Sequence, residues 1–304
     1  MVMKSSAPII YVVEPFGGSI RRHNPTLPMV YWDDAAVTRG DGVFETLLVR
    51  QGRAANFERH MDRFRSSAEL MDLPDPGVAQ WAEATEAAVA EWTAQSDEDA
   101  RCVWTYTRGR ESTGIPSAWL TVRSIDEQVV AQRSTGIKVM TAHRGYSLHT
   151  EDSADSAEPP APWLIVGAKT LSYAANMAAL RYARAQGFDD VIYLDPDTGK
   201  VLEGATSTVV TVRKGGKLRT PTPGPDILPG TTQAALFDYA ERHGWRCKTK
   251  DITMDRLYDA ESVWLVSSVR VATRITHLDG VKLPVPSHKE EAEIRELMDK
   301  ALGR

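Results

Sequence analysis

Hydrophobic and polar residues alternate in short runs along the first half of the chain, and these runs predict a mixture of strands and helices. Residues 43–49 (VFETLLV) alternate with a period close to two, which favours a strand, and residues 51–53 (QGR) then predict a hairpin turn. Residues 57–71 repeat with helical spacing, so that Phe64 and Met71 share one stripe. The other elements predicted in this half are a helix over residues 78–92 and short strands over residues 103–107 and 118–122.

The second half is more clearly divided by glycine and proline. A helix is expected over residues 171–186, because Gly187 follows it as a stop signal. Residues 195–199 (DPDTG) predict a tight turn, because proline fixes φ and glycine accepts a positive φ. The other elements expected here are strands over residues 163–166, 190–194, 201–212 and 262–266 and a helix over residues 233–243.

This mixture predicts an α/β (α+β) fold. A length of 304 residues, at roughly 150 residues per domain, suggests about two domains. Because residues 124–136 are polar and resemble a connector, we expect a small N-terminal α/β domain over residues 1–129 and a larger, β-rich C-terminal domain over residues 130–304. Residues 150–162 are acidic and rich in proline, which predicts a solvated surface loop; a lid over a site is the alternative.

Composition excludes several classes of protein. Apolar residues make up 42% and charged residues 25% of the chain, which is ordinary for a globular protein. The net charge is −5 and no strongly basic patch occurs, so we expect no nucleic-acid partner. The apolar run at residues 9–13 is too short to span a bilayer, so we expect no membrane contact. Cys102 and Cys247 lack the spacing of a metal site or a disulfide framework. We therefore expect a cytoplasmic protein that uses no metal and acts on a small molecule.

Lys169 is the first candidate for chemistry, because it stands where an apolar run ends and a helix is expected to begin. Partial burial lowers the pKa of an amine, and the free amine can form an imine with an aldehyde. The alternative is an ordinary solvated lysine.

Glu203 is the second candidate, because it interrupts a segment that otherwise has the pattern of a buried strand. A carboxylate beside a pyridine nitrogen keeps that nitrogen protonated, and the ring then accepts electrons. The small residues that follow, 204–207 (GATS), would let a flat ring approach the backbone. The alternative is a carboxylate at a strand edge or beside a turn.

Residues 230–232 (GTT) open a predicted helix, where free N–H groups and the helix dipole attract an anion; simple capping by threonine is the alternative. Ser268 follows a predicted strand and gives a similar, weaker signal, and Arg63 adds a cation that is otherwise a solvated charge. An imine-forming lysine, a carboxylate for a ring nitrogen and a phosphate cradle are the three functions that pyridoxal 5′-phosphate requires.

The order of these features resembles the fold-type IV pyridoxal-phosphate enzymes, which include branched-chain aminotransferases, D-amino acid aminotransferases and 4-amino-4-deoxychorismate lyases. The matching stretches are residues 40–46 (GDGVFET), 60–63 (HMDR), 168–170 (AKT), 190–195 (DVIYLD), 203–207 (EGATS), 227–232 (ILPGTT) and 263–268 (VWLVSS). The resemblance covers about residues 30–285. It implies a two-domain fold with pyridoxal 5′-phosphate in the larger C-terminal domain, and a homodimer in which the neighbouring subunit contributes to the pocket.

The resemblance also implies a role for each candidate. Lys169 would hold the cofactor covalently and then move the substrate proton, and Glu203 would pair with the pyridine nitrogen. The residues that would bind the phosphate are Arg63, Thr231, Thr232 and Ser268. Tyr173 would reach the phenolate oxygen of the cofactor, with a tyrosine of the core as the alternative, and Phe44 would line the substrate side.

The resemblance points to one reaction first. The stretches most similar to actinobacterial 4-amino-4-deoxychorismate lyases are residues 40–50, 169–173 and 266–269. They imply a lyase of folate biosynthesis that yields 4-aminobenzoate and pyruvate, with Thr38 one residue beyond the position of the catalytic hydroxyl in the lyases. The alternative is an aminotransferase that acts on D- or branched-chain amino acids. In an aminotransferase, Arg108 or Arg110 would replace an Arg-x-His pair that is missing here. In the lyase, Arg270 would meet a substrate carboxylate, with a surface arginine as the alternative.

Overall fold

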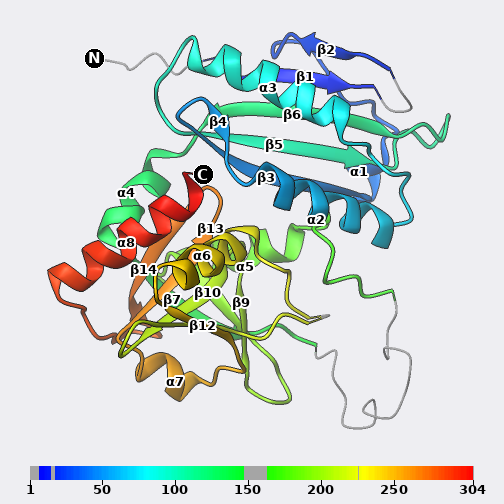
Figure 1. Cartoon of the computed structure of the whole chain (residues 1–304). Helices are drawn as coiled ribbons and strands as arrows, with labels where there is room; N and C mark the ends of the chain where they lie inside the picture. Colours follow the sequence, from blue (N-terminus) through cyan, green and yellow to red (C-terminus); the bar gives the residue numbers. More distant parts are fainter. Residues whose placement is uncertain (1–6, 15–17, 147–162, 225, 304) are drawn as a thin grey trace. The chain divides into compact units, whose positions relative to one another are not determined.

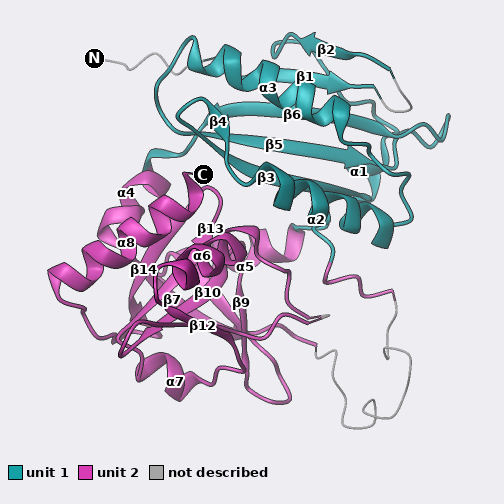
Figure 2. Ribbon diagram, viewed as in Figure 1, with its two compact units in different colours: residues 1–127, 168–173 teal, residues 128–167, 174–304 magenta. Residues whose placement is uncertain are grey.

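The structure is a computed structural model that describes residues 7–14, 18–146, 163–224 and 226–303 (Figure 1). The chain divides into two compact units (Figure 2). Unit 1 comprises Met1–Glu127 and Ala168–Tyr173, and unit 2 comprises Gln128–Gly167 and Ala174–Arg304. The domain boundary expected between residues 129 and 130 stays a prediction. The segment that carries Lys169 belongs to unit 1, although the sequence had suggested the C-terminal domain.

Unit 1 is an antiparallel sheet with two helices packed on it (Figure 1). Its described elements are β1 (Ile9–Val13), β2 (Ile20–His23), α1 (Ala35–Thr38), β3 (Gly42–Arg50), β4 (Arg53–Ala54), α2 (Phe57–Leu70), α3 (Ala79–Thr93), β5 (Ala100–Thr107) and β6 (Ser117–Ser124). The strand order is β2-β1-β6-β5-β3-β4. Helices α2 and α3 pack on the sheet through an apolar cluster that contains Phe64, Trp81, Trp92 and Trp104.

Strand β3 shows why its alternating pattern was informative. Val43 and Leu47 are fully buried in the cluster beneath the helices, and Glu45 shares their face because side chains alternate along a strand. Gln51 and Gly52 form the hairpin turn with φ values of 51° and 71°. Positive φ at both central residues is what a two-residue turn between twisted strands requires.

Unit 2 is built on a larger mixed sheet. Its described elements are α4 (Glu127–Thr135, whose first residue belongs to unit 1), β7 (Ile137–His143), α5 (Ala174–Ala185), β8 (Asp190–Leu194), β9 (Val201–Gly204), β10 (Thr208–Arg213), β11 (Lys217–Thr220), α6 (Thr231–Arg242), β12 (Arg246–Thr249), α7 (Met254–Tyr258), β13 (Ser262–Ser267), β14 (Val271–Leu278), β15 (Val281–Lys282) and α8 (His288–Leu302). The strand order is β12-β11-β10-β13-β14-β7-β8-β9, with β15 beside β14.

Both faces of this second sheet are buried. On β13, Val263 and Leu265 belong to one apolar cluster, while Trp264 and Val266 belong to another that includes residues of α6 and α8. Alternate residues of one strand point to opposite faces, so the two clusters lie on opposite sides of the sheet. The mixed α/β (α+β) fold class predicted from the sequence is confirmed.

Two secondary-structure predictions around Lys169 were wrong. Residues 163–166 do not form a strand, and Trp163 is 75% exposed. The helix expected from residue 171 begins only at Ala174, because residues 169–171 instead pair with the edge of β3. Local periodicity cannot detect a pairing with a strand that lies more than a hundred residues away in the sequence.

Two other expectations need correction. The strand predicted over residues 201–212 is divided into β9 and β10 by a tight turn in which the Gly204 N–H donates to the carbonyl oxygen of Ser207 at 2.8 Å. Residues 124–136, expected to be a polar connector, contain helix α4. The acidic, proline-rich stretch at residues 150–162 lies outside the described residues.

The lengths of the helices can be compared with the length needed to cross a membrane. Within the described ranges, no helix combines the length and the apolar character needed to cross a bilayer. Helices α3 and α8 each contain 15 residues, whereas a span needs about 20 predominantly apolar residues.

Glycine at residue 109 should be essential to the fold. A Cβ there would lie 1.7 Å from the Ile115 carbonyl oxygen, at a φ of 84°. Gly114 also has a positive φ of 66°, but a Cβ there would meet nothing within 4 Å. We expect Gly114→Ala to cost about 1–2 kcal/mol of unfolding free energy from backbone strain alone, and Gly109→Ala to cost about 1–3 kcal/mol more from the clash. Urea unfolding of both variants measures the difference; equal losses would contradict the steric explanation.

Candidate active site

Backbone pairing with the edge of β3 holds the segment that contains Lys169. The Phe44 N–H donates to the Lys169 carbonyl oxygen at 3.0 Å, and the Leu171 N–H donates to the Gly42 carbonyl oxygen at 2.8 Å. Between them, Val43 and Thr170 form an antiparallel bridge. A Cβ at Gly42 would lie 2.9 Å from the Leu171 side chain, so glycine permits this close approach. The main chain of Lys169 therefore has a fixed position on unit 1.

The lysine side chain lies among aromatic groups. Lys169 Nζ donates to the Tyr173 hydroxyl at 3.2 Å and lies 4.3 Å from the centre of the Phe44 ring. The rings of Phe44 and Tyr173 meet edge to face, with their centres 5.1 Å apart. The structure thus brings together three residues that the sequence singled out. The half-buried amine has one hydroxyl partner in this group and an apolar wall, as a nucleophile requires.

A buried carboxylate holds the arginine of the HMDR motif. Glu45 is fully buried on β3; it accepts hydrogen bonds from Arg63 Nε at 2.7 Å and Nη2 at 2.8 Å, and pairs with His60 Nδ1 at 2.6 Å. Ser67, one turn after Arg63 on α2, accepts the Lys169 N–H at 3.0 Å. The sequence analysis assigned no role to Glu45, His60 or Ser67. An acidic residue on the apolar face of VFETLLV was the signal that could have revealed the first of them.

The electrostatics of this cluster follow from its burial. Burial disfavours ionisation of Glu45, but the Arg63 guanidinium and His60 outweigh it and hold the pKa of the carboxyl well below its usual value. Burial lowers the pKa of His60, although Glu45 acts in the opposite direction. We infer an ionised Glu45, a neutral His60 that donates through Nδ1, and a permanently charged Arg63.

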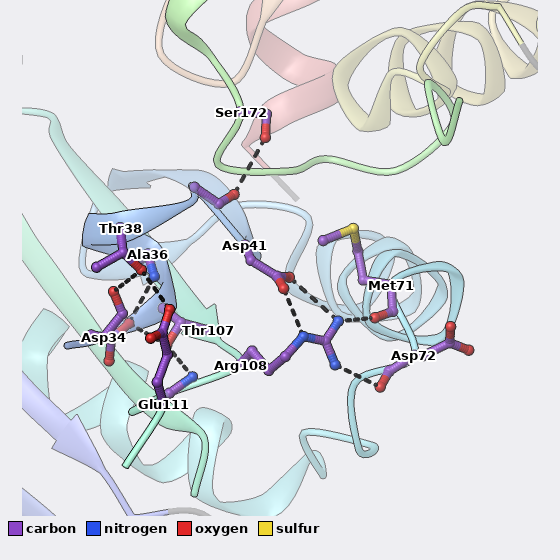
Figure 3. A network of polar contacts seen from close by, with 12 residues as sticks. Asp34, Ala36, Thr38, Asp41, Met71, Asp72, Thr107, Arg108, Glu111 and Ser172 are labelled. Atoms are coloured by element: carbon purple, nitrogen blue, oxygen red, sulfur yellow. Dashed lines mark hydrogen bonds and ion pairs between the residues drawn. The ribbon is translucent and has the colours of Figure 1, made fainter. Parts of the chain in front are cut away.

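Thr38 lies at the end of α1, in a polar network of unit 1 (Figure 3). Its hydroxyl has two acceptors within reach of its single proton: the Asp34 carbonyl oxygen at 3.2 Å and Glu111 Oε1 at 3.4 Å. Asp34 caps α1 by accepting the Ala36 N–H at 2.9 Å. The Thr38 side chain is exposed, so its hydroxyl remains accessible.

Arg108 belongs to the same network but is engaged by the protein itself (Figure 3). Its Nε donates to Asp41 at 2.7 Å, and its two terminal nitrogens donate to the carbonyl oxygens of Met71 at 2.6 Å and Asp72 at 3.3 Å. Arg108 therefore connects Asp41, in the loop before β3, with Met71 and Asp72 at the end of α2. Ser172 approaches the same loop, within 3.4 Å of the Gly40 carbonyl oxygen.

In unit 2, Glu203 lies on β9, directly before a tight turn. The turn is held by the Ala205 N–H, which donates to the Val191 carbonyl oxygen at 3.1 Å, and by Asn176 Nδ2, which donates to the Ala205 carbonyl oxygen at 2.6 Å. Ser207 Oγ is buried and has no hydrogen-bond partner among the described residues. An unsatisfied buried hydroxyl costs free energy, so it indicates a place where a polar ligand group would be stabilised.

The N-terminus of α6 brings together the predicted phosphate residues of unit 2. Thr232 Oγ1 and Ser268 Oγ lie 3.4 Å apart, and both residues are buried, as is Thr231. Gly230 caps this 12-residue helix without a side-chain hydrogen bond, and a Cβ there would lie 2.3 Å from Thr208 Oγ1. Buried hydroxyls around a helix N-terminus favour an anion, so these residues fit a phosphate.

Arg270 is not a surface arginine. Its side chain is 12% exposed, and its Nη2 donates to Asp190 Oδ2 at 2.6 Å. Its Nη1 is buried without a hydrogen-bond partner among the described residues. Burial raises the pKa of Asp190, and the neighbouring guanidinium counteracts that shift.

The residues present fit the cofactor that the resemblance implies. Within unit 1, the Lys169 amine has the surroundings that imine formation needs. Within unit 2, the unsatisfied Ser207 hydroxyl and the hydroxyls at α6 suit the polar groups of such a cofactor, and Glu203 is a carboxylate that could pair with a ring nitrogen. No group of three or more His, Cys, Asp or Glu side chains in the described part of the chain is arranged to hold a metal ion.

Comparisons with known proteins agree on one family. The family model described as amino-transferase class IV matches residues 42–278. The chain is 44% identical over 266 residues to a bifunctional aminodeoxychorismate lyase / D-amino acid transaminase of Mycobacterium tuberculosis, covering 86% of this chain and 89% of that protein. It is 26% identical to a D-alanine aminotransferase of Listeria monocytogenes, covering 83% of each.

Solved structures show the same likeness. A hypothetical aminotransferase from Mycobacterium tuberculosis matches with a TM-score of 0.87 and 41% identity, covering 97% of this chain and 98% of that one. It is known in a PLP-bound form and in a form that holds alpha-ketoglutarate and PMP. These matches confirm the predicted two-domain, fold-type IV architecture.

The buried Glu45 cluster should dominate the stability of unit 1. Glu45→Gln keeps the shape of the side chain but leaves the Arg63 charge without its carboxylate, and we expect it to cost about 3–5 kcal/mol of unfolding free energy. Glu296→Gln removes an exposed carboxylate that pairs with Lys300 on α8 and serves as the control, with no measurable effect expected. Urea unfolding measures the unfolding free energy of both variants. A loss of unfolding free energy in Glu45→Gln as small as that in Glu296→Gln would contradict the stabilising role of the Glu45–Arg63 pair.

Proposed function

This chain belongs to the class IV aminotransferases, pyridoxal 5′-phosphate enzymes, and we propose that it is a 4-amino-4-deoxychorismate lyase that releases pyruvate and 4-aminobenzoate. The observation that carries the proposal is the set of contacts around Lys169: a fixed backbone, a hydroxyl partner and an aromatic wall. The lyase activity in the name of the Mycobacterium tuberculosis relative supports the choice of reaction.

Lys169 and Glu203 would act on opposite ends of the cofactor. Bound pyridoxal phosphate supplies an electron-accepting ring that stabilises negative charge on the carbon bearing the substrate nitrogen. Lys169 would hold the cofactor at its aldehyde carbon, and Glu203 would keep the ring nitrogen protonated. Tyr173, which already accepts a hydrogen bond from Lys169, would reach the phenolate oxygen.

The phosphate would be bound by one cation and several hydroxyls. Arg63, whose plane is fixed by Glu45, would supply the charge. The other proposed ligands are Thr231, Thr232 and Ser268. Binding the tail of the cofactor at a helix N-terminus would leave Lys169 to act at the other end.

Four residues are candidates for acting on the substrate. Phe44 would line its apolar side, and the exposed Thr38 hydroxyl would serve the leaving group as a proton donor or acceptor. Arg270 would receive a substrate carboxylate through its unpaired Nη1. Arg108, which contacts Asp41 and two carbonyl oxygens, would influence the substrate by holding the loop before β3.

Proton transfer is the step that the chain itself performs. When the substrate amine replaces Lys169, the freed Nζ would take the proton from the carbon that bears the substrate nitrogen. A base held beside that carbon reacts as part of one molecule, which is the advantage of proximity. Loss of the enolpyruvyl group then gives pyruvate, and the ring becomes aromatic.

The alternative function is an aminotransferase that acts on D- or branched-chain amino acids. In this reaction Lys169 would take the same proton and return it at a different atom, and a keto acid would be needed to accept the amino group. The second activity in the name of the 44% identical relative and the D-alanine aminotransferase both favour this alternative. The keto acid held by the Mycobacterium tuberculosis structure is a further argument for it.

We also propose that the enzyme is a homodimer, as its family resemblance implies. Large apolar side chains before β3 are exposed: Tyr31 by 57%, Trp32 by 81% and Val37 by 63%. Such residues are typical of a surface that another chain covers. A cytoplasmic location stays a prediction from composition.

The two reactions differ in one requirement. We expect the purified enzyme to convert aminodeoxychorismate into 4-aminobenzoate without any keto acid, because the lyase reaction returns the cofactor unchanged. Liquid chromatography of products, with and without alpha-ketoglutarate, measures this. Absence of 4-aminobenzoate together with keto-acid-dependent turnover of an amino acid would replace the lyase by the aminotransferase.

Lys169→Ala should reduce 4-aminobenzoate formation by about 10²–10⁴-fold, the usual contribution of a general base. Some cofactor should remain bound through the phosphate ligands. Lys248→Ala, at an exposed lysine on β12, is the control and should retain full activity. Unchanged turnover in Lys169→Ala would falsify the lysine assignment.

A further inference from the structure

The turn between β13 and β14 carries Ser268 and is strained. Val271, the first residue of β14, has a φ of 60°. This left-handed backbone is rare for any residue other than glycine and is costly for a β-branched one. Strain of this kind persists only where the surrounding structure fixes the backbone.

Three contacts fix the turn. Arg133 of α4 donates to the Val269 carbonyl oxygen at 2.7 Å, and the Arg270 N–H approaches Ser267 Oγ at 3.4 Å. The third contact is the ion pair of Arg270 with Asp190, at 2.6 Å. Ser268 lies between residues that are held on both sides, and its hydroxyl lies 3.4 Å from that of Thr232.

Asp190 also belongs to the strand that holds the turn after Glu203. It is fully buried at the start of β8, where it accepts the N–H of Val191 at 2.7 Å. The carbonyl oxygen of the same Val191 accepts the Ala205 N–H. The beginning of β8 therefore contacts both segments proposed to bind the cofactor in unit 2. It holds the turn after Glu203 through the main chain of Val191, and the 267–271 turn through the side chain of Asp190.

We propose that Asp190 is a positioning residue for the cofactor phosphate: through Arg270 it sets the strained 267–271 turn that presents Ser268. This inference rests on the proposed contact of Ser268 with the phosphate. The reason for preferring it to a purely stabilising ion pair is geometric. A pair that served only to fill the core would not need to join the 267–271 turn to the start of β8, which also holds the turn after Glu203.

The test compares pyridoxal 5′-phosphate with pyridoxal, which lacks the phosphate but retains the aldehyde. We expect Asp190→Asn to raise the dissociation constant of pyridoxal 5′-phosphate for the full-length apoenzyme about tenfold, a size typical of the outer partners of a bound group. The dissociation constant of pyridoxal should stay unchanged. Absorbance titration measures both. An equal change for the two ligands, or no change for either, would overturn the proposal.

Two further variants keep the test decisive. Asp190→Leu combined with Arg270→Met replaces the buried pair by apolar groups, a change that proteins often tolerate, and it should show the same selective loss if the single variant does not fold. Glu291→Gln is the matched control, because it removes a carboxylate from other partly buried ion pairs of unit 2, with Arg274 on β14 and Arg295 on α8. Its ratio of the two dissociation constants should equal that of the wild type; a selective loss there would contradict a specific role for Asp190.

Ser268→Ala separates this proposal from the one on which it rests. We expect the same selective loss of pyridoxal 5′-phosphate affinity as in Asp190→Asn. A selective loss of pyridoxal 5′-phosphate affinity in Ser268→Ala, without such a loss in Asp190→Asn, would overturn the positioning role of Asp190 and leave the proposed contact of Ser268 with the phosphate standing. An unchanged ratio in Ser268→Ala would overturn the proposed phosphate contact, and this inference with it.

Discussion

The pairing of residues 169–171 with the edge of β3 is the constraint on which the chemistry of this chain depends. Two hydrogen bonds and one bridge fix the lysine backbone, so the flexible side chain starts from a defined position. Side-chain contacts with Tyr173 and Phe44 then limit where the amine can go. A lysine on a free loop would lose more conformational entropy each time it met a substrate.

Each unit, taken by itself, holds a different kind of polar group. Unit 1 holds charges through a buried carboxylate: Glu45 orients Arg63 with two hydrogen bonds. Unit 2 relies on neutral donors, with the Thr232 and Ser268 hydroxyls close together at a helix N-terminus. Hydroxyls and main-chain N–H groups bind an anion without the desolvation cost of a second buried cation. The ion pair of Asp190 shapes the backbone around them.

Local pattern sufficed for part of the fold. Alternation over residues 43–49 identified β3, and residues 190–194 became β8, because each strand buries its own apolar residues. The sequence singled out Thr232 because residues 230–232 open a predicted helix, and Ser268 because it follows a predicted strand; the structure places their hydroxyls 3.4 Å apart. The strand predicted over residues 163–166 does not form, because an apolar run is buried only if another segment of the chain covers it.

What the sequence did not reveal depends on long-range contacts. No local rule connects Glu45 to Arg63, eighteen positions later, or Asp190 to Arg270, eighty positions later. Each pair forms because the fold brings a strand next to a helix or a turn that is distant in the sequence: β3 next to α2 for Glu45 and Arg63, and the start of β8 next to the 267–271 turn for Asp190 and Arg270. The roles proposed for Lys169, Glu203 and the hydroxyls at α6 come from resemblance to a family, and the structure adds the contacts that hold the Lys169 backbone and the turn after Glu203.

The central claim is that Lys169 is the residue that holds the cofactor. Borohydride reduction of the full-length holoenzyme, followed by digestion and mass spectrometry, locates the attached pyridoxyl group directly. We expect one modified peptide, with the pyridoxyl group on Lys169. Attachment to a different lysine would contradict it.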